Sequence, residues 1–162
     1  MALNHYQPAK VIAEIGCNHM GQMDIAKELI RLARECGASV AKFQKRTPKE
    51  LLTPEQYNAP HPVPYNSYGA TYGEHREFLE LSAAQHAELK AYCDELGIGY
   101  STSVWDVTSA REIAALNPDF LKVPSACNNH FEMLRVLRDE FKGEVHASTG
   151  MTTREEEDAL VA

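Results

Sequence analysis

The sequence contains no long apolar run. No stretch of its 162 residues approaches the roughly 20 apolar residues that a membrane-spanning helix requires. Residues 1–10 are mostly polar and lack the apolar core of a secretory signal peptide. We therefore expect a cytoplasmic protein with no membrane partner.

Positive charge is scarce as well. The chain carries 16 Lys and Arg residues against 23 Asp and Glu residues, which gives a net charge of -7. No cluster of basic residues with interleaved aromatic residues is present, so the electrostatic footprint of a nucleic-acid-binding protein is missing. The expected partners are small molecules or other proteins.

Cysteine is sparse, and its residues are widely separated. The chain has four, which include no C-x-x-C pair: Cys17, Cys36, Cys93 and Cys127. This spacing argues against a zinc knuckle and against a disulfide framework. We expect all of these thiols to be reduced.

Short apolar stretches alternate with amphipathic stretches along most of the chain. Strands are predicted at 11–15, 40–43, 99–103, 120–123 and 144–147. Helices are predicted from about 74, at 24–36, 82–96, 108–116 and 129–141, and from Thr153 onward. This regular alternation of strand and helix is typical of an α/β protein with a parallel sheet.

The segment 47–73 breaks the alternation, because it is rich in Pro, Tyr, Asn and Gly. It contains Pro48, Pro54, Pro60, Pro62 and Pro64. Since proline fixes φ and lacks an N–H group, we predict a long loop that is irregular through most of its length. Loops of this length within compact domains are usually functional.

The number of predicted strands leaves two architectures open. Five parallel strands suffice for an open, flavodoxin-like sheet, whereas a (β/α)8 barrel needs eight strands and about 200 residues or more. Periodicity alone therefore favours the open sheet.

Every predicted strand ends in polar residues. In chain order these are Glu14, Asn18 and His19; Lys42 and Gln44; Ser101, Thr102 and Ser103; Lys122 and Ser125; and Ser148, Thr149 and Gly150. The C-terminal ends of parallel strands meet at one edge of a sheet, which is where α/β enzymes bind their substrates. The pattern predicts one functional rim.

Two lysines and several hydroxyl groups at one rim predict an anion site, and a phosphorylated substrate is the natural occupant. Lys42 and Lys122 supply charge, while the hydroxyl groups orient oxygen atoms. A Schiff-base role for either lysine is compatible with the pattern but not required by it. Glu14 lies within an apolar strand, so we expect it either to pair with Lys42 or to bind a polar ligand.

Five motifs, in a fixed order along the chain, include these strand ends. They are EIGCNHMG at 14–21, VAKFQ at 40–44, TYGEHREFLEL at 71–81, KVPSA at 122–126 followed by Asn128 and Asn129, and STGM at 148–151. Together they resemble the sialic acid (N-acetylneuraminate) synthase family. The resemblance implies a (β/α)8 barrel of the TIM type in place of the open sheet. Residues 1–162 would be the N-terminal portion of this barrel, incomplete and limited to the first five βα units, and the family's C-terminal antifreeze-like domain would be absent.

That family condenses phosphoenolpyruvate with an N-acetylated aminosugar, typically N-acetylmannosamine or a related 6-deoxy aminosugar. The products are a nine-carbon 2-keto acid of the sialic acid type and phosphate, and the resemblance implies this transferase activity here. At the matching positions it implies catalytic roles for Glu14, Lys42 and Lys122, and substrate-binding roles for Gln44, Thr102, Ser125 and Ser148. Phosphoenolpyruvate would contact the lysines and hydroxyl groups, and the aminosugar would face Glu14 and Gln44.

The resemblance also implies a divalent metal ion, Mn2+ or Mg2+. The family's metal-binding histidines come from later strands than this chain contains, so no metal ligand is predicted within it. The family dimer implies a homo-oligomer, or association with the missing half of the barrel. We expect a truncated or split chain, or one that completes itself by association, because a five-strand piece exposes two strand edges and an apolar interior.

Two other functions remain open. One is a related phosphoenolpyruvate aldol synthase that acts on a phosphosugar, which would need a second basic pocket. Only Arg46 and Arg76 are spare cations near the rim, and this disfavours it. The other is a non-catalytic fragment that retains the phosphoenolpyruvate half-site.

Overall fold

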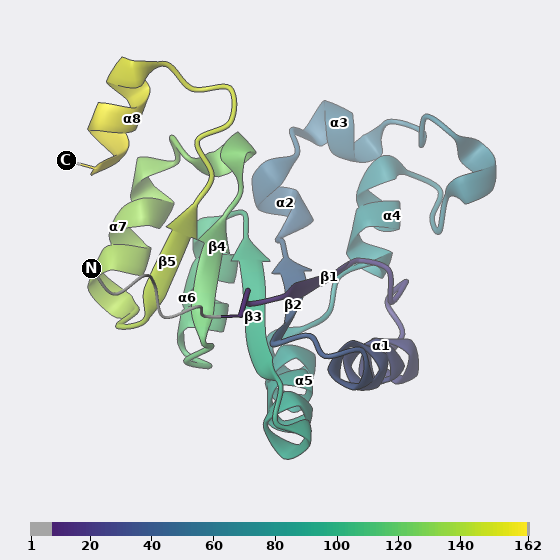
Figure 1. Ribbon diagram of the computed structural model, residues 1–162. Helices are drawn as coiled ribbons and strands as arrows, with labels where there is room; N and C mark the ends of the chain where they lie inside the picture. Colours follow the sequence, from purple (N-terminus) through teal and green to yellow (C-terminus); the bar gives the residue numbers. More distant parts are fainter. Residues whose placement is uncertain (1–7, 162) are drawn as a thin grey trace.

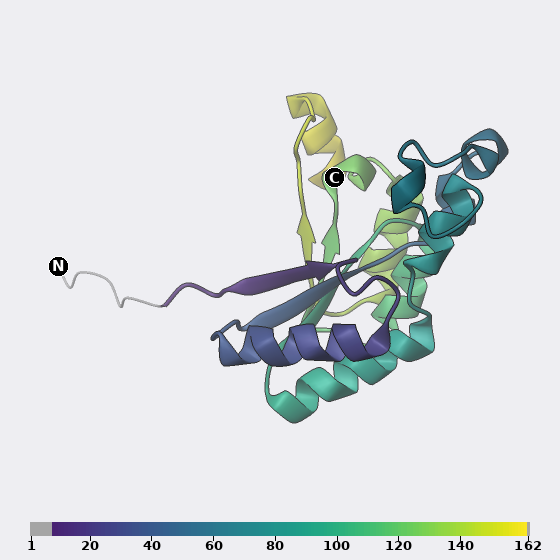
Figure 2. The same ribbon diagram turned by 90° about the vertical axis from the view of Figure 1, so that its right-hand side faces the viewer.

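The computed structural model describes residues 8–161 and contains one parallel sheet of five strands (Figure 1). The strands are β1 (Ile12–Gly16), β2 (Val40–Lys45), β3 (Gly99–Val104), β4 (Phe120–Val123) and β5 (Glu144–Ala147). They lie side by side in sequence order, and each neighbouring pair is parallel. The sheet is strongly twisted, so β1 and β5 run in clearly different directions in Figure 2.

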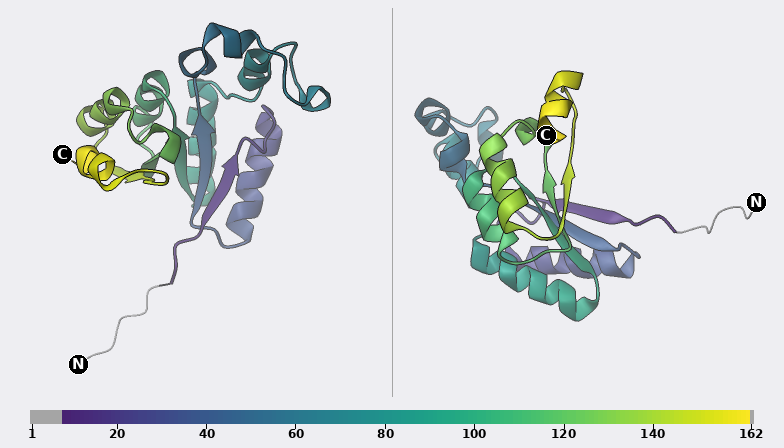
Figure 3. Two further views of the ribbon diagram at one scale, coloured as in Figure 1. Left: turned by 90° about the horizontal axis from the view of Figure 1, so that it is seen from above. Right: turned by 90° about the vertical axis from the view of Figure 1, so that its left-hand side faces the viewer.

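Helices cover one face of the sheet and leave the other face open (Figure 3). The covering helices are α1 (Met23–Glu35), α5 (Ala83–Leu96), α6 (Val107–Ala114) and α7 (Phe131–Glu140). A further helix, α8 (Arg154–Val161), follows β5. No helix in the described part of the chain is both long and apolar enough to cross a membrane.

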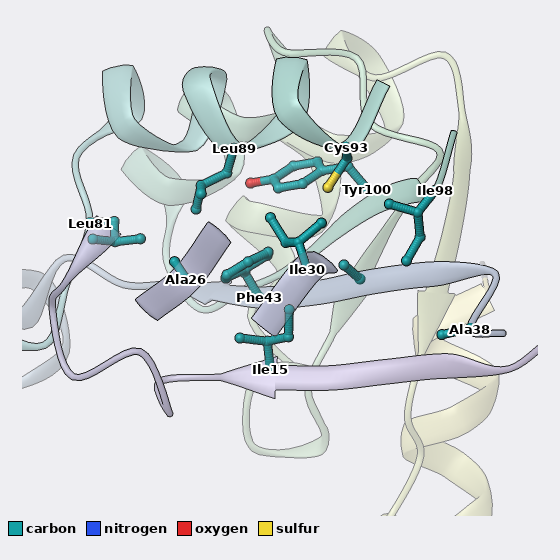
Figure 4. Close-up of a cluster of buried hydrophobic side chains, with 11 residues drawn as sticks. Ile15, Ala26, Ile30, Ala38, Phe43, Leu81, Leu89, Cys93, Ile98 and Tyr100 are labelled. Carbon is teal, nitrogen blue, oxygen red and sulfur yellow. The ribbon is translucent and has the colours of Figure 1, made fainter. Parts of the chain in front are cut away.

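Alternate strand residues are buried against the helices in two apolar clusters. The first lies between β1, β2 and β3 and the helices α1 and α5 (Figure 4); its members include Ile15, Ile30, Phe43, Leu89 and Tyr100. The second lies between β3, β4 and the helices α6 and α7; its members include Val104, Ile113, Leu121, Val123 and Leu137. Because successive strand residues point to opposite faces, the intervening residues lie on the open face.

The strand order distinguishes the two architectures. A flavodoxin-like sheet has the order 2-1-3-4-5 with helices on both faces. Here the order is β1-β2-β3-β4-β5 with helices on one face, as in the first five βα units of a (β/α)8 barrel. The open sheet favoured by periodicity is therefore wrong, and the barrel type is confirmed. Periodicity counts strands, but it carries no information on which strands become neighbours.

The segment between β2 and α5 lies beyond the C-terminal ends of β2 and β3 (Figure 1). It contains α2 (Pro48–Leu51), α3 (Pro54–Asn58), the 3-10 helix η1 (Pro64–Asn66) and α4 (Tyr72–Phe78). The prediction of a mostly irregular loop over 47–73 is wrong in part. A proline is the first residue of α2, α3 and η1, a position where its missing N–H costs nothing and its fixed φ suits a helix.

Helix ends agree with prediction where the capping chemistry is strong. The side chain of Ser82 accepts a hydrogen bond from the backbone N–H of Gln85, and the side chain of Gln85 accepts one from the backbone N–H of Ser82. This capping box marks the start of α5. Gly97, with φ 65°, ends that helix in the left-handed conformation. Thr153 and Glu156 form the same reciprocal pair at the start of α8.

Candidate active site

The open face of the sheet carries two rows of side chains near the C-terminal ends of the strands. The row nearer these ends contains Gln44, Ser103, Lys122 and His146, which are neighbours in the register. The next row contains Glu14, Lys42, Ser101, Phe120 and Glu144. The sheet thus places residues from five strands on one surface.

Lys42 lies at the centre of this group. Its ammonium contacts the carboxylate of Glu14 and lies 3.4 Å from Oγ of Ser103. Gln44 Nε2 donates to Oε1 of the same carboxylate at 3.4 Å. The Lys42 side chain is 13% exposed and that of Glu14 is 50% exposed, so the pair joins a largely buried ammonium to a half-exposed carboxylate. Of the two expectations for Glu14, the structure shows the pair with Lys42.

The two lysines are close enough for their charges to interact. Burial and, to a smaller extent, the positive charge of Lys122 lower the pKa of Lys42 to about 8. Burial also lowers the pKa of Lys122. The contact with Glu14 acts in the opposite direction on Lys42, since a carboxylate stabilises the charged ammonium. An anion between the lysines would likewise stabilise both charged forms.

Gly16 allows Glu14 and Gln44 to approach each other. It ends β1 with φ +56°, in the region that glycine tolerates best. A Cβ atom at this position would lie 3.2 Å from Nε2 of Gln44 and 3.3 Å from Oε1 of Glu14. Any other residue would therefore strain the backbone and crowd both side chains.

Thr102 does not belong to this group. It is fully buried, and its Oγ1 donates to Oη of Tyr100 at 2.9 Å on the side of the sheet that faces the helices. The same Tyr100 oxygen lies 2.6 Å from Nδ1 of the buried His86. The structure therefore brings Ser103, and not the expected Thr102, to the lysines.

The sequence did carry a signal for this difference. Tyr100 and Val104 are large apolar residues at even spacing from Thr102, so strand alternation places all three on the buried face. Ser101 and Ser103 then fall on the opposite face. Matching motif positions selects Thr102, whereas strand alternation places Ser103 on the face that carries the lysines.

Ser125 and Ser148 lie where β4 and β5 end. Ser125 begins the 3-10 helix η2 (Ser125–Cys127), and the carbonyl of Ser148 accepts Nδ2 of Asn128 at 3.1 Å. A Cβ atom on Gly150 would lie 3.7 Å from Oγ of Ser125, so both serines adjoin the turn after β5. Within residues 8–161, no hydrogen bond joins either hydroxyl to the two lysines.

The described residues do not fit the divalent metal that the resemblance implies. Within residues 8–161, no group of three or more His, Cys, Asp or Glu side chains is arranged to hold such an ion. His19 is buried, and its Nδ1 accepts the N–H of Gly21 at 3.1 Å. Glu14 already contacts an ammonium.

The chain has the features of the βα-barrel class of α/β proteins. Its parallel strands lie in sequence order, helices cover one face of the sheet, and lysines lie near the C-terminal ends of the strands. Residues 29–162 match the model of the NeuB family. The chain therefore belongs to the NeuB family.

Individual relatives agree with this assignment. The chain is similar to N-acetylneuraminate-9-phosphate synthase of Homo sapiens, with 42% identity over 127 residues that cover 78% of this chain and 35% of the relative. It is 34% identical to the protein of the same name in Drosophila melanogaster. That match extends over 151 residues and covers 93% of this chain and 40% of the relative. The chain thus spans 35% to 40% of the length of these two proteins.

A solved structure supports the fold. The crystal structure of N-acetylneuraminic acid (sialic acid) synthetase from Leptospira borgpetersenii serovar Hardjo-bovis superposes with a TM-score of 0.77. The match covers 99% of this chain and 53% of that chain, at 20% sequence identity. At this identity the likeness concerns the fold alone.

The first prediction concerns Gly16. We expect Gly16→Ala to lower the free energy of unfolding by more than Gly97→Ala, measured by urea denaturation. Both positions have positive φ, which costs a residue with a Cβ about 1–2 kcal/mol. Nothing lies within 4 Å of a Cβ at Gly97, so the control isolates the crowding of Glu14 and Gln44. Equal losses would contradict this account of the site.

The second prediction concerns Lys42. Its folded-state pKa of about 8 lies below the ordinary 10.5, so the unfolded chain binds more protons between these pH values. Relative to Lys42→Met, the stability of the wild type should therefore rise as pH increases from about 8 to about 10.5. Urea denaturation at several pH values measures this, and NMR of the Lys42 side chain gives the pKa directly. A measured pKa of 10.5 or above for Lys42 would contradict this prediction, because the carboxylate of Glu14 would then raise the pKa more than burial lowers it.

Proposed function

We propose that this chain carries the phosphoenolpyruvate-binding part of a synthase that condenses phosphoenolpyruvate with an N-acetylated aminosugar. The products would be a nine-carbon 2-keto acid of the sialic acid type and phosphate. One observation carries the proposal: Lys42 and Lys122, from different strands, share the open face, and Ser103 on the strand between them is the register partner of Lys122 and lies 3.4 Å from Nζ of Lys42. Membership of the NeuB family supports it.

The chemistry of phosphoenolpyruvate suits this surface. The molecule carries a phosphate and a carboxylate, and the two lysines supply matching positive charge. An ammonium attracts anions without a fixed direction, whereas a hydroxyl group selects the position of one oxygen atom. In this proposal Ser103 donates from between the lysines, and Ser125 and Ser148 donate from the ends of β4 and β5.

In the proposed reaction, C3 of the enol attacks the aldehyde carbon of the open-chain aminosugar and forms the new C–C bond. The aldehyde oxygen gains a proton, and water adds at the cationic C2 and loses one. The C–O bond to phosphate then breaks and the C2 hydroxyl passes its proton to the departing phosphate, which leaves a ketone at C2. Glu14 and Gln44 hold the sugar, and the half-exposed Glu14 carboxylate accepts the proton from water. Positioning and charge stabilisation provide most of the acceleration.

A second candidate function is the same condensation with a phosphorylated aminosugar as the acceptor of phosphoenolpyruvate. The relatives in Homo sapiens and Drosophila melanogaster are named N-acetylneuraminate-9-phosphate synthase. Because phosphoenolpyruvate contributes three of the nine carbons, a 9-phosphate product requires an aminosugar phosphorylated at its sixth carbon. The expectation that Arg46 is a spare cation is wrong, since it is buried against Glu80. Of the two expected arginines, this leaves Arg76, which lies over the ring of Tyr72 at 5.9 Å.

The surface beside β5 is apolar and open. A groove of about 760 Å³ lies between β5, α7 and α8, and its lining includes Phe131, Leu134, Val145, Leu160 and Val161. Contiguous exposed apolar surface commonly marks an interaction site, and the edge of a sheet is normally protected. In this proposal the groove is covered by another polypeptide, either a second copy of the chain or one that supplies further βα units.

The third prediction tests the phosphoenolpyruvate site by titration calorimetry. Lys122→Ala should weaken binding roughly 10- to 100-fold, since a charged hydrogen bond contributes about 1.5–3 kcal/mol. Ser103→Ala should weaken it roughly fivefold, because a neutral hydrogen bond contributes about 1 kcal/mol. Thr102→Val is the matched control, with unchanged affinity expected, because Thr102 is buried on the helix side.

Phosphate release in the same samples, with manganese added, separates catalysis from binding. The acceptors to compare are N-acetylmannosamine, its 6-phosphate and arabinose 5-phosphate. Release with either aminosugar supports the synthase, and release with arabinose 5-phosphate alone supports the phosphosugar aldol synthase. Binding without release from any acceptor supports the non-catalytic alternative. Binding that survives Lys122→Ala, or that Thr102→Val abolishes while Ser103→Ala does not, contradicts the proposed site.

The fourth prediction concerns association. Light scattering of the isolated chain should give the mass of two or more copies, because without a polypeptide that supplies further βα units a second copy would cover the apolar groove. Val145→Glu should shift the mass toward one copy, since Val145 lines the groove and is 39% exposed. Tyr65→Glu, at an 88% exposed residue of η1, is the control and should change nothing. A well-behaved wild-type monomer with cooperative unfolding would contradict self-association.

A further inference from the structure

Arg46 is the first residue after β2, and its side chain is buried. It is 7% exposed, and its partner Glu80, between α4 and α5, is 9% exposed. Oε1 of Glu80 accepts Nε–H of Arg46 at 2.7 Å, and Oε2 accepts the backbone N–H of Arg46 at 3.0 Å. One carboxylate therefore fixes both the backbone and the side chain at the end of β2.

The guanidinium of Arg46 also reaches the loops that follow β1 and β3. Its Nη2 contacts Sγ of Cys17, which follows β1. Its Cζ lies 5.5 Å from the centre of the Trp105 ring, which follows β3. The ends of three neighbouring strands are thus in contact with one planar cation.

These three loop residues lie close in sequence to residues of the proposed site. Cys17 is three residues beyond Glu14, Arg46 is two beyond Gln44, and Trp105 is two beyond Ser103. Burying two charges is costly unless hydrogen bonds and geometry compensate, so a buried ion pair contributes little net stability. The guanidinium fork is rigid and has several donors, which makes it suitable for fixing the spacing of separate segments.

We propose that Arg46, held by Glu80, is a positioning residue that sets the distances among Glu14, Gln44 and Ser103 without touching the substrate. This inference rests on the proposed function, because these distances matter to catalysis only if the three residues act on one pair of substrates. It also assigns the buried cation to the scaffold of the rim and not to an acceptor phosphate.

The neighbouring residue provides a matched comparison. Lys45 is also buried, and its Nζ lies 3.4 Å from Oε2 of Glu112 on α6. This pair connects the same end of β2 to the helix layer. It differs from the Arg46 pair in its contacts: within residues 8–161, Nζ of Lys45 donates to the backbone carbonyl of Arg46 at 3.2 Å and forms no hydrogen bond to Cys17 or Trp105.

Hydrogen exchange measured by mass spectrometry on the full 162-residue chain tests the positioning role. Glu80→Gln should accelerate amide exchange roughly tenfold or more at 16–19 and 104–106, in the loops that Arg46 contacts. Glu112→Gln should leave both segments at the wild-type rate. Acceleration confined to the neighbourhood of residue 80, or equal acceleration throughout the chain, would overturn the proposal.

Arg46→Lys is a second variant that retains the positive charge beside Glu80. Lysine lacks the planar fork that contacts Cys17 and Trp105 at the same time. We expect this variant to stay folded and to show the same acceleration at 16–19 and 104–106. Wild-type exchange in Arg46→Lys would overturn the positioning role, because charge alone would then suffice.

Binding and turnover distinguish this inference from the proposed function. Glu80→Gln should change the affinity for phosphoenolpyruvate less than about threefold while lowering kcat with the aminosugar roughly tenfold or more, since small misplacements of reacting groups reduce rate strongly. Unchanged kcat despite accelerated exchange would overturn the positioning role. A wild-type chain that does not bind phosphoenolpyruvate would refute the proposed function, while the exchange comparison would still decide whether Arg46 organises the rim.

Discussion

Two ammonium groups on one partly buried surface are the constraint on which the rest of the site depends. Lys42 and Lys122 each lose hydration, and the charge of Lys122 disfavours the charged form of Lys42. Glu14 offsets part of this cost from one side. Lys122 forms no ion pair within residues 8–161, and in the proposed function a small dianion would supply the negative charge beside it.

Local sequence determined much of the fold. The bounds of β4 and β5 agree with prediction residue by residue, because short apolar runs between turn residues have few alternatives. Strand order could not be predicted in this way, since pairing depends on contacts between segments far apart in the chain. The proline-rich segment was misread because proline is unfavourable inside a helix but favourable at its first position.

Part of the site was also predictable. Lysines at the ends of two parallel strands must share a rim, and the structure places Lys42 and Lys122 there. Sequence position did not show that Arg46 is buried, because its partner Glu80 lies 34 residues away. The choice between Thr102 and Ser103 was within reach of the sequence, since it follows from strand alternation.

The division of the apolar interior has a consequence for cooperativity. One cluster supports the strand that carries Lys42, the other supports the strand that carries Lys122, and the two share no buried residue. Strand β3 contributes Tyr100 to one and Val104 to the other. Partial opening of either half would separate the lysines while the other half stays folded. In the proposed function, ligand binding would therefore be lost at a lower free energy than global unfolding requires, and a bound dianion that bridges the halves would couple their unfolding.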